Sequence, residues 1–253
     1  MNVIPQGVRD RFSAALDPLA RLLIRLHVRP NVVTTLGTAI LFVAATAFAL
    51  GRVRWGGFLV LLSGLFDMID GRVARQGRMT TTFGAFYDST LDRVGEAVLF
   101  TGIALYFLRG GIAADRLTLA VVACLWALAA SLLVSYTRAR AEGLGLSAKV
   151  GIAQRAERIV LLGAPTWWFG AGAGGTLLFW IVVALALTTM ITVVERVAYV
   201  ARTAGGSGAP SGPSGPVAPG GPVAPGGPAS RRPPHARDTL PGRAPALQSQ
   251  KGS

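Results

Sequence analysis

Apolar runs separated by short polar segments fill most of the chain between residues 30 and 203. Crossing a bilayer takes about 20 helical residues, and six of the apolar runs are predicted to be transmembrane helices. The predicted spans are 32–50, 55–74, 83–108, 117–136, 154–169, which is short and extended by its polar start, and 176–200. The pattern therefore predicts an all-α integral membrane protein with six transmembrane helices.

The segment before these runs, residues 1–29, has the pattern of an amphipathic helix over residues 4–28. Its apolar stripe and its basic side chains are Leu16, Leu19, Leu22, Leu23 and Leu26, with Arg9, Arg11, Arg21, Arg25 and Arg29. This combination is typical of a helix that lies in the membrane interface. A mitochondrial targeting peptide is the competing interpretation, and Asp10 and Asp17 count against it. Residues 1–11 are polar and lack the apolar core of a cleavable signal peptide.

After Ala204 the composition changes to Gly, Pro, Ser and Ala, with the repeat GGPVAP. Such a segment cannot bury enough apolar surface to fold. We therefore expect three parts: an amphipathic helix (1–29), a six-helix membrane domain (30–203) and a disordered tail (204–253).

Composition supports a membrane protein, since 51% of the residues are hydrophobic and only 15% are charged. The formal net charge is +13, but the basic residues are dispersed between apolar runs. Nucleic-acid binding is therefore not indicated, and anionic lipids and phosphate substrates are the expected partners. The one cysteine, Cys124, excludes a disulfide framework and a CxxC metal site.

The distribution of lysine and arginine between the loops sets the orientation of a protein in the membrane. With the N-terminus inside, the loops on that side add eight basic residues to the five N-terminal arginines, against four outside. The inner eight are Arg72, Arg75, Arg78, Arg138, Arg140, Lys149, Arg155 and Arg158. The pattern predicts a plasma-membrane protein whose N-terminus, acidic stretch and C-terminal tail are cytoplasmic.

Four aspartates, Asp67, Asp70, Asp88 and Asp92, lie within the second and third spans. A carboxylate at membrane depth costs on the order of a few kcal/mol, so such residues are rare and usually functional. Their spacing of three and four residues places each pair on one helix face, and the short connection makes the two helices antiparallel neighbours. Converging carboxylates require a cation, and hard oxygen ligands suit Mg²⁺ or Mn²⁺. The alternative is purely structural pairing with Arg72, Arg75 and Arg93, or a cation-transport site.

The sequence Asp67-x2-Asp70-Gly71-x2-Ala74-Arg75-x8-Gly84-x3-Asp88-x3-Asp92 resembles the signature of the CDP-alcohol phosphotransferases at all eight fixed positions. These membrane enzymes move a substituted phosphate from a CDP-linked lipid to an alcohol and release CMP. The resemblance implies that Asp67, Asp70, Asp88 and Asp92 hold one or two divalent cations and that Asp92 is the general base. It also implies CDP-diacylglycerol as donor and a homodimer. The implied CDP-lipid site comprises Pro30, Asn31, Thr34, Asp67, Gly71, Ala74, Arg75 and Gly84.

The acceptor is indicated by a basic region, residues 138–158, which carries five basic and two acidic residues. A phosphorylated acceptor needs such charge and a neutral one does not, although positive-inside anchoring would also place arginines there. The region resembles the inositol-phosphate branch of the family, which implies transfer to an inositol phosphate, although Gln154 departs from the branch's usual acid. The implied phosphate ligands are Arg138, Arg140, Arg155 and Arg196. Glycerol 3-phosphate, also anionic, remains the alternative acceptor.

Overall fold

The computed structural model describes residues 16–146 and 155–206, with side chains up to Thr203. These residues form α2 (Asp17–Arg25), α3 (Pro30–Ala49), α4 (Val53–Gln76), α5 (Thr82–Tyr106), η1 (Phe107–Gly111), α6 (Ala114–Gly143), α7 (Arg155–Phe169), η2 (Ala173–Gly175) and α8 (Thr176–Gly206). No strand occurs in these two ranges, so the prediction of an all-α protein is confirmed. The predicted tail, apart from residues 204–206 at the end of α8, lies outside the described residues, as do Gln154 and Lys149.

Three of these helices are long and apolar enough to cross a membrane: α3, α6 and the segment Ala173–Thr203, which includes α8. The other three long helices fall at the places predicted for spans, but their composition differs. α4 and α5 carry the aspartates and several arginines, and α7 has only 15 residues. The chain is therefore a membrane protein by its three apolar helices, and the count of six spans stays a prediction.

Local signals explain where several helices begin. Pro30 occupies the first turn of α3, where its missing N–H costs nothing. Thr81 caps α5, since its hydroxyl accepts a hydrogen bond from the Gly84 amide at 2.9 Å. This cap ends the short connection from Gly77 and starts α5 just before Asp88.

The predicted N-terminal helix appears in the described residues as the nine-residue α2. Its leucine stripe is divided by packing: Leu16 is buried against α4, whereas Leu19, Leu22 and Leu26 are exposed. Residues 1–15 lie outside the described part of the chain. An interfacial role for the whole segment therefore stays a prediction.

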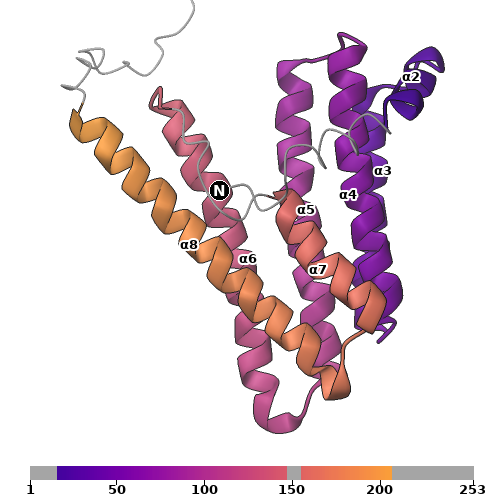
Figure 1. The fold of residues 1–253 in the computed structure, drawn as a ribbon, viewed down its shortest axis with the longest axis vertical. Coiled ribbons are helices and arrows are strands. Elements are labelled where there is room, and N and C mark those ends of the chain that lie inside the picture. Colours follow the sequence, from indigo (N-terminus) through magenta and orange to yellow (C-terminus); the bar gives the residue numbers. More distant parts are fainter. Residues whose placement is uncertain (1–15, 147–154, 207–253) are drawn as a thin grey trace, which may run out of the picture. The chain divides into compact units, whose positions relative to one another are not determined.

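α3 packs against both α4 and α5, while α6 pairs with α8 (Figure 1). α7 contacts α4 on one side and α8 on the other, and α2 lies against α4. A core that includes Leu41, Phe48, Ile103 and Leu178 joins α3, α5 and α8. These contacts bring α7 against the part of α4 that carries the acidic stretch.

Glycines allow α4 and α7 to approach closely. A Cβ at Gly64 would lie 2.8 Å from Ile159 Cγ2, and one at Gly163 would lie 2.7 Å from Leu61 Cγ. Both distances are below normal contact, so the helices could not pack this way with larger residues. This close approach sets Arg155, at the start of α7, beside Asp67 of α4.

Candidate metal centre and nucleotide pocket

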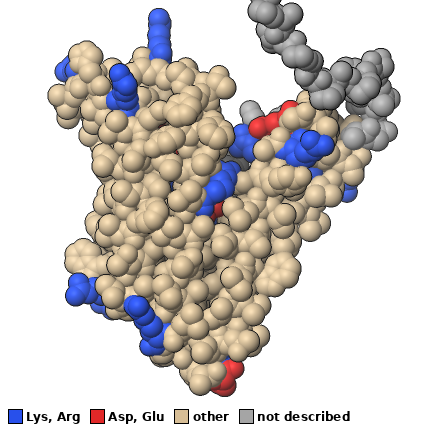
Figure 2. Space-filling model, turned by 180° about the vertical axis from the view of Figure 1, so that it is seen from behind, with Lys and Arg blue, Asp and Glu red and all other residues tan. Residues whose placement is uncertain are grey.

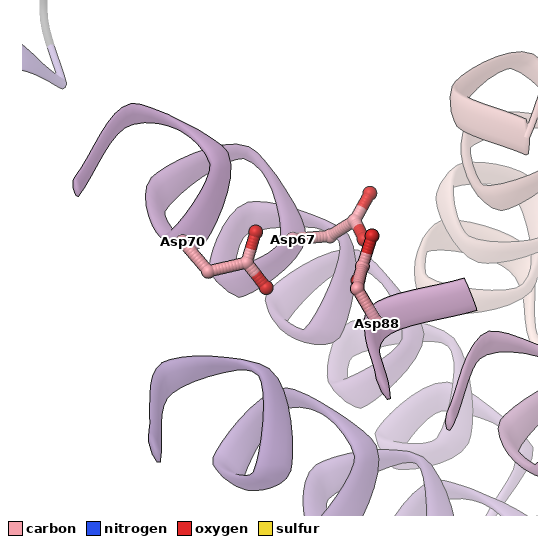
Figure 3. Close-up of side chains that lie close together, drawn as sticks. All are labelled: Asp67, Asp70 and Asp88. Atoms are coloured by element: carbon pink, nitrogen blue, oxygen red, sulfur yellow. The ribbon is translucent and has the colours of Figure 1, made fainter. Parts of the chain in front are cut away.

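Asp67 and Asp70 of α4 and Asp88 of α5 point toward one another between the two helices (Figure 3). One carboxylate oxygen from each lies within 4.8 Å of the others. Asp70 is buried, and Asp67 and Asp88 are half-buried. The three carboxylates thus converge as the residue spacing predicts, although α4 and α5 pack on α3 rather than directly on each other.

Two oxygens of this cluster are buried without a hydrogen-bond partner in the described residues, Asp70 Oδ2 and Asp88 Oδ1. A buried acceptor of this kind costs about 1–3 kcal/mol, and more when charged. A divalent cation coordinated by the carboxylates would supply the missing partner and cancel their repulsion. The donor set, all oxygen and all anionic, therefore fits a hard divalent cation.

Structural ion pairing, the alternative, accounts for one part of the acidic group, Asp92, which pairs with Arg93. Arg72 pairs with Asp17 of α2, away from the cluster, and Arg93 lies 3.4 Å from Asp92. Within the described residues no arginine is ion-paired with Asp70 or Asp88. Asp70 and Asp88 thus each keep a free oxygen for a ligand.

Asp92, one turn beyond Asp88 on α5, lies beside the three-carboxylate cluster and faces α7. The Arg155 guanidinium forms an ion pair with Asp92 and comes within 3.3 Å of Asp67 Oδ1. Arg155 therefore links the cluster to Asp92. The structure groups three of the four predicted ligands, and metal ligation by Asp92 stays a prediction.

A pocket of about 160 Å³ opens beside the cluster. Asp70 and Asp88 line it, and so do all the residues predicted for the CDP-lipid site except Asp67. The remaining lining residues are Met79, Thr80, Thr81 and Ala85, which the sequence did not single out. Residues up to 58 positions apart in the chain, from Pro30 to Asp88, thus form one concave site next to the acids.

Two glycines shape this pocket. A Cβ at Gly71 would lie 3.1 Å from Nη1 of Arg75, so the guanidinium lies directly over the Gly71 backbone. A Cβ at Gly84 would lie 3.0 Å from Thr81 Oγ1 and 3.4 Å from Asn31 Oδ1. Any side chain at either position would crowd a polar group that lines or borders the pocket.

The four arginines predicted for the acceptor occupy different environments. Arg155 lies at the acids, whereas Arg196 of α8 is buried and donates a hydrogen bond to the Val134 carbonyl of α6. Arg138 is exposed and pairs with Glu142 at 2.9 Å. Its positive charge also repels that of Arg196. Arg140 is exposed. Figure 2 shows blue and red side chains together in a hollow of this face, while most of the surface around it is uncharged.

A second buried ion pair lies deeper on the same helices and was not predicted. Arg158 of α7 contacts Glu96 of α5 at 2.8 Å and donates to the Ser131 hydroxyl of α6. The signal for it was present, because Glu96 is a lone acid within an apolar run. This pair ties α5, α6 and α7 together about one turn from the Arg155–Asp92 contact.

An apolar cavity of about 450 Å³ lies between α4 and α7. Its wall includes Phe58, Leu61, Ile159 and Trp167, and Asp67 also lines it. Asp67 thus stands between an acidic cluster and an apolar space.

Comparison with known proteins agrees with this site. Residues 27–194 match the model of the CDP-alcohol phosphatidyltransferase family. The chain is 39% identical over 202 residues to the phosphatidylinositol phosphate synthase of Cutibacterium acnes, covering 77% of this chain and 96% of the relative.

Two crystal structures of the Mycobacterium tuberculosis phosphatidylinositol phosphate synthase are similar to this one. The structure with CDP-DAG bound has a TM-score of 0.62 and 34% identity, covering 72% of this chain and 92% of that one. The structure in complex with manganese and citrate has a TM-score of 0.63 and 33% identity, covering 72% and 87%. With the three-carboxylate cluster and the adjoining pocket, these matches show that the chain belongs to the CDP-alcohol phosphatidyltransferase family.

Proposed function

We propose that this protein transfers a phosphatidyl group from CDP-diacylglycerol to an inositol phosphate and releases CMP. The observation that carries the proposal is the cluster of Asp67, Asp70 and Asp88 beside a pocket lined by the rest of the family signature. The similarity to phosphatidylinositol phosphate synthases supports this choice of donor and acceptor.

The nucleotide of the donor binds in the pocket beside the acids. Arg75 provides a fork of donors for the phosphates, and Gly71 and Gly84 let the ligand approach the backbone. Pro30, Asn31, Thr34 and Ala74 complete the wall on the α3 and α4 sides.

The acyl chains occupy the apolar cavity between α4 and α7. A lipid whose pyrophosphate lies at the acids reaches this cavity past Asp67, which belongs to the acidic cluster and also lines the cavity.

Asp67, Asp70 and Asp88 hold one or two divalent cations, Mg²⁺ or Mn²⁺, with Asp92 as a further ligand where two are bound. When bound, the metal neutralises charge that develops on the pyrophosphate oxygens. Manganese in the structure of the related synthase supports a divalent cation and leaves both metals as candidates.

Asp92 is the general base. The acceptor hydroxyl attacks the phosphorus bonded to diacylglycerol, and the bond to the bridging oxygen breaks, so that CMP leaves with that oxygen. The hydroxyl proton goes to Asp92, which Arg155 orients through its ion pair. The same arginine is then available to the acceptor phosphate.

The acceptor phosphate binds the arginines on the α6, α7 and α8 side. Arg155 stands nearest the acids, and Arg138 and Arg196 approach each other from α6 and α8. Glu142, which pairs with Arg138, balances one of these two positive charges and leaves one for an anionic acceptor. Arg140, exposed on α6, adds to the positive field that attracts the anionic acceptor.

The membrane arrangement that fits this chemistry has six spans, α3 to α8, with α2 in the interface. The acids then face the cytoplasm at the plasma membrane, together with the N-terminus and the C-terminal tail. We further propose a homodimer and the three-part division 1–29, 30–203 and 204–253. The exposed leucines of α2 and the lysine and arginine distribution support this orientation.

Acceptor competition tests the proposed function. Purified protein receives CDP-diacylglycerol, Mg²⁺ and equal amounts of inositol 1-phosphate, glycerol 3-phosphate, free inositol and serine, and the lipid products are separated by mass. We expect phosphatidylinositol phosphate to dominate, because the arginines favour a phosphorylated polyol. A predominance of phosphatidylglycerol phosphate would reject inositol phosphate as the acceptor, and products from serine or free inositol would reject the phosphate-binding role of the arginines.

A further inference from the structure

The short helix α2 is tied to the end of α4 by one carboxylate. Asp17, the first residue of α2, accepts a hydrogen bond from the Gln76 side-chain amide at 2.9 Å and an ion-paired one from Arg72. The Arg72 side chain is only 15% exposed, so this charge pair is partly shielded from water. Arg72 and Gln76 lie 55 and 59 positions after Asp17 in the chain.

This contact lies on the back of the nucleotide pocket. The last two turns of α4 present one face to α2. On this face Arg72 and Gln76 donate to Asp17. Ile69 and Val73, also on this face, belong to an apolar cluster with Leu16 and Ala20. The opposite face of the same turns lines the pocket, through residues Asp70, Gly71, Ala74 and Arg75. A shift of α4 relative to α2 would therefore move the pocket wall.

The connection after α4 depends on α2 as well. Met79 lines the pocket and also packs against the apolar cluster shared by α2, α3 and α4. A Cβ at Gly77 would lie 3.5 Å from Ile24 Cγ1, which shows how closely α2 borders this connection. Two parts of the pocket wall thus rest on a helix that itself lines no part of it.

We propose that Asp17 is a positioning residue for the CDP-lipid pocket, and that α2 acts through it as a clamp on the end of α4. The inference rests on the proposed function, since it assigns CDP to this pocket. Asp17 does not touch the substrate. It fixes the α4 backbone, and thereby the Arg75 guanidinium and the Met79 side chain, at the distance that the nucleotide needs.

Kinetics of the Asp17→Asn variant test this role. The substitution keeps the shape and removes the charge, and a partly exposed ion pair of up to about 1 kcal/mol corresponds to a change in affinity of up to roughly fivefold. We expect the KM for CDP-diacylglycerol to rise by about this factor. The kcat and the KM for the acceptor should stay near the wild-type values. The charge-exchanged pair, Asp17→Arg with Arg72→Asp, should restore the KM in part.

The matched control is Asp115→Asn, which removes the carboxylate of an exposed pair with Arg116 at 4.0 Å, at the start of α6. Its KM for CDP-diacylglycerol should be unchanged. Equal losses of kcat/KM for CDP-diacylglycerol and for the acceptor would overturn the proposal. A folded Asp17→Asn protein with an unchanged KM for CDP-diacylglycerol would also overturn it.

Equilibrium binding of CDP, measured by calorimetry, gives a second readout that does not need turnover. Weaker CDP binding by Asp17→Asn would support the clamp even if the wild-type protein showed no transfer to any acceptor, which would reject only the proposed function. If Asp17→Asn cannot be purified, Gln76→Glu takes its place, because Gln76 is exposed and the new carboxylate repels Asp17. Unchanged CDP binding by that variant would then overturn the proposal.

Discussion

Replacing Asp70 by Asn is expected to lower CMP release by at least about a hundredfold, because metal stabilisation of the developing charge is worth several kcal/mol. Asp70 is the most buried acid of the cluster, and its Oδ2 has no hydrogen-bond partner in the described residues. An amide keeps the size of the side chain but loses the charge that a hard cation requires. The measurement is CMP release with CDP-diacylglycerol and inositol 1-phosphate over a range of Mg²⁺ concentrations.

The metal dependence separates this loss from misfolding. Wild-type protein should bind Mn²⁺ in a paramagnetic resonance titration, and Asp70→Asn should bind it far more weakly while retaining its melting temperature. Asp115→Asn, which changes an exposed carboxylate away from the cluster, is the control for loss of one negative charge. Normal activity and normal Mn²⁺ binding by Asp70→Asn would show that the cluster is not the metal centre.

Replacing Asp92 by Asn should reduce the kcat by about 10²- to 10⁴-fold, which is the usual contribution of a positioned general base. Asp92 lies beside the three-carboxylate cluster and is ion-paired with Arg155. The amide can still accept a hydrogen bond from Arg155, so the arginine remains near its place. The amide that replaces the Asp92 carboxylate cannot, however, take the proton of the acceptor hydroxyl. Single-turnover CMP release from preformed complexes with CDP-diacylglycerol measures this chemical step.

Binding measurements complete the assignment of Asp92. CDP should bind the Asp92→Asn protein with an affinity close to that of the wild-type protein, because Asp92 does not line the pocket that we propose for the nucleotide. Activity within a few-fold of normal would contradict the role as base. Loss of CDP binding together with activity would instead assign Asp92 to the structure of the site.

The acidic site could be predicted from sequence because local rules determine it. Spacings of three and four residues set Asp67 with Asp70 and Asp88 with Asp92 on single helix faces. The short connection returns α5 to the level of the α4 acids, and the Thr81 cap fixes where α5 begins. The prediction that α4 and α5 pack as direct neighbours was wrong, because α3 packs against both of them. The eight-residue signature adds the glycines, whose lack of a Cβ agrees with the pocket geometry.

The partners of the charged residues could not be predicted in the same way. Arg72 was a candidate partner for the acids, but it turns to Asp17 of α2 because its neighbours Ile69 and Val73 pack on that helix. Glu96 lies in the apolar part of α5 and Arg158 near the polar start of α7, and only the tertiary fold brings the two together. Periodicity identifies a face of a helix, but it does not identify which helix lies opposite.

Helix ends also departed from the hydrophobic pattern. α6 continues to Gly143, beyond the predicted end at residue 136, because Arg138, Arg140 and Glu142 are good helix formers outside the apolar run. Arg138 and Glu142 also form an i,i+4 pair that supports this extra turn. The hydropathy pattern marks the membrane-spanning part of a helix and misses its polar extension.

Product formation by the purified protein tests the central claim most directly. CDP-diacylglycerol and inositol 1-phosphate are supplied with Mg²⁺ or with a chelator, and CMP and the lipid product are quantified together by mass spectrometry. We predict equal amounts of CMP and phosphatidylinositol phosphate with Mg²⁺, and neither product with the chelator. Transfer that continues without a divalent cation, or CDP-diacylglycerol that stays intact with inositol 1-phosphate and Mg²⁺, would contradict the account.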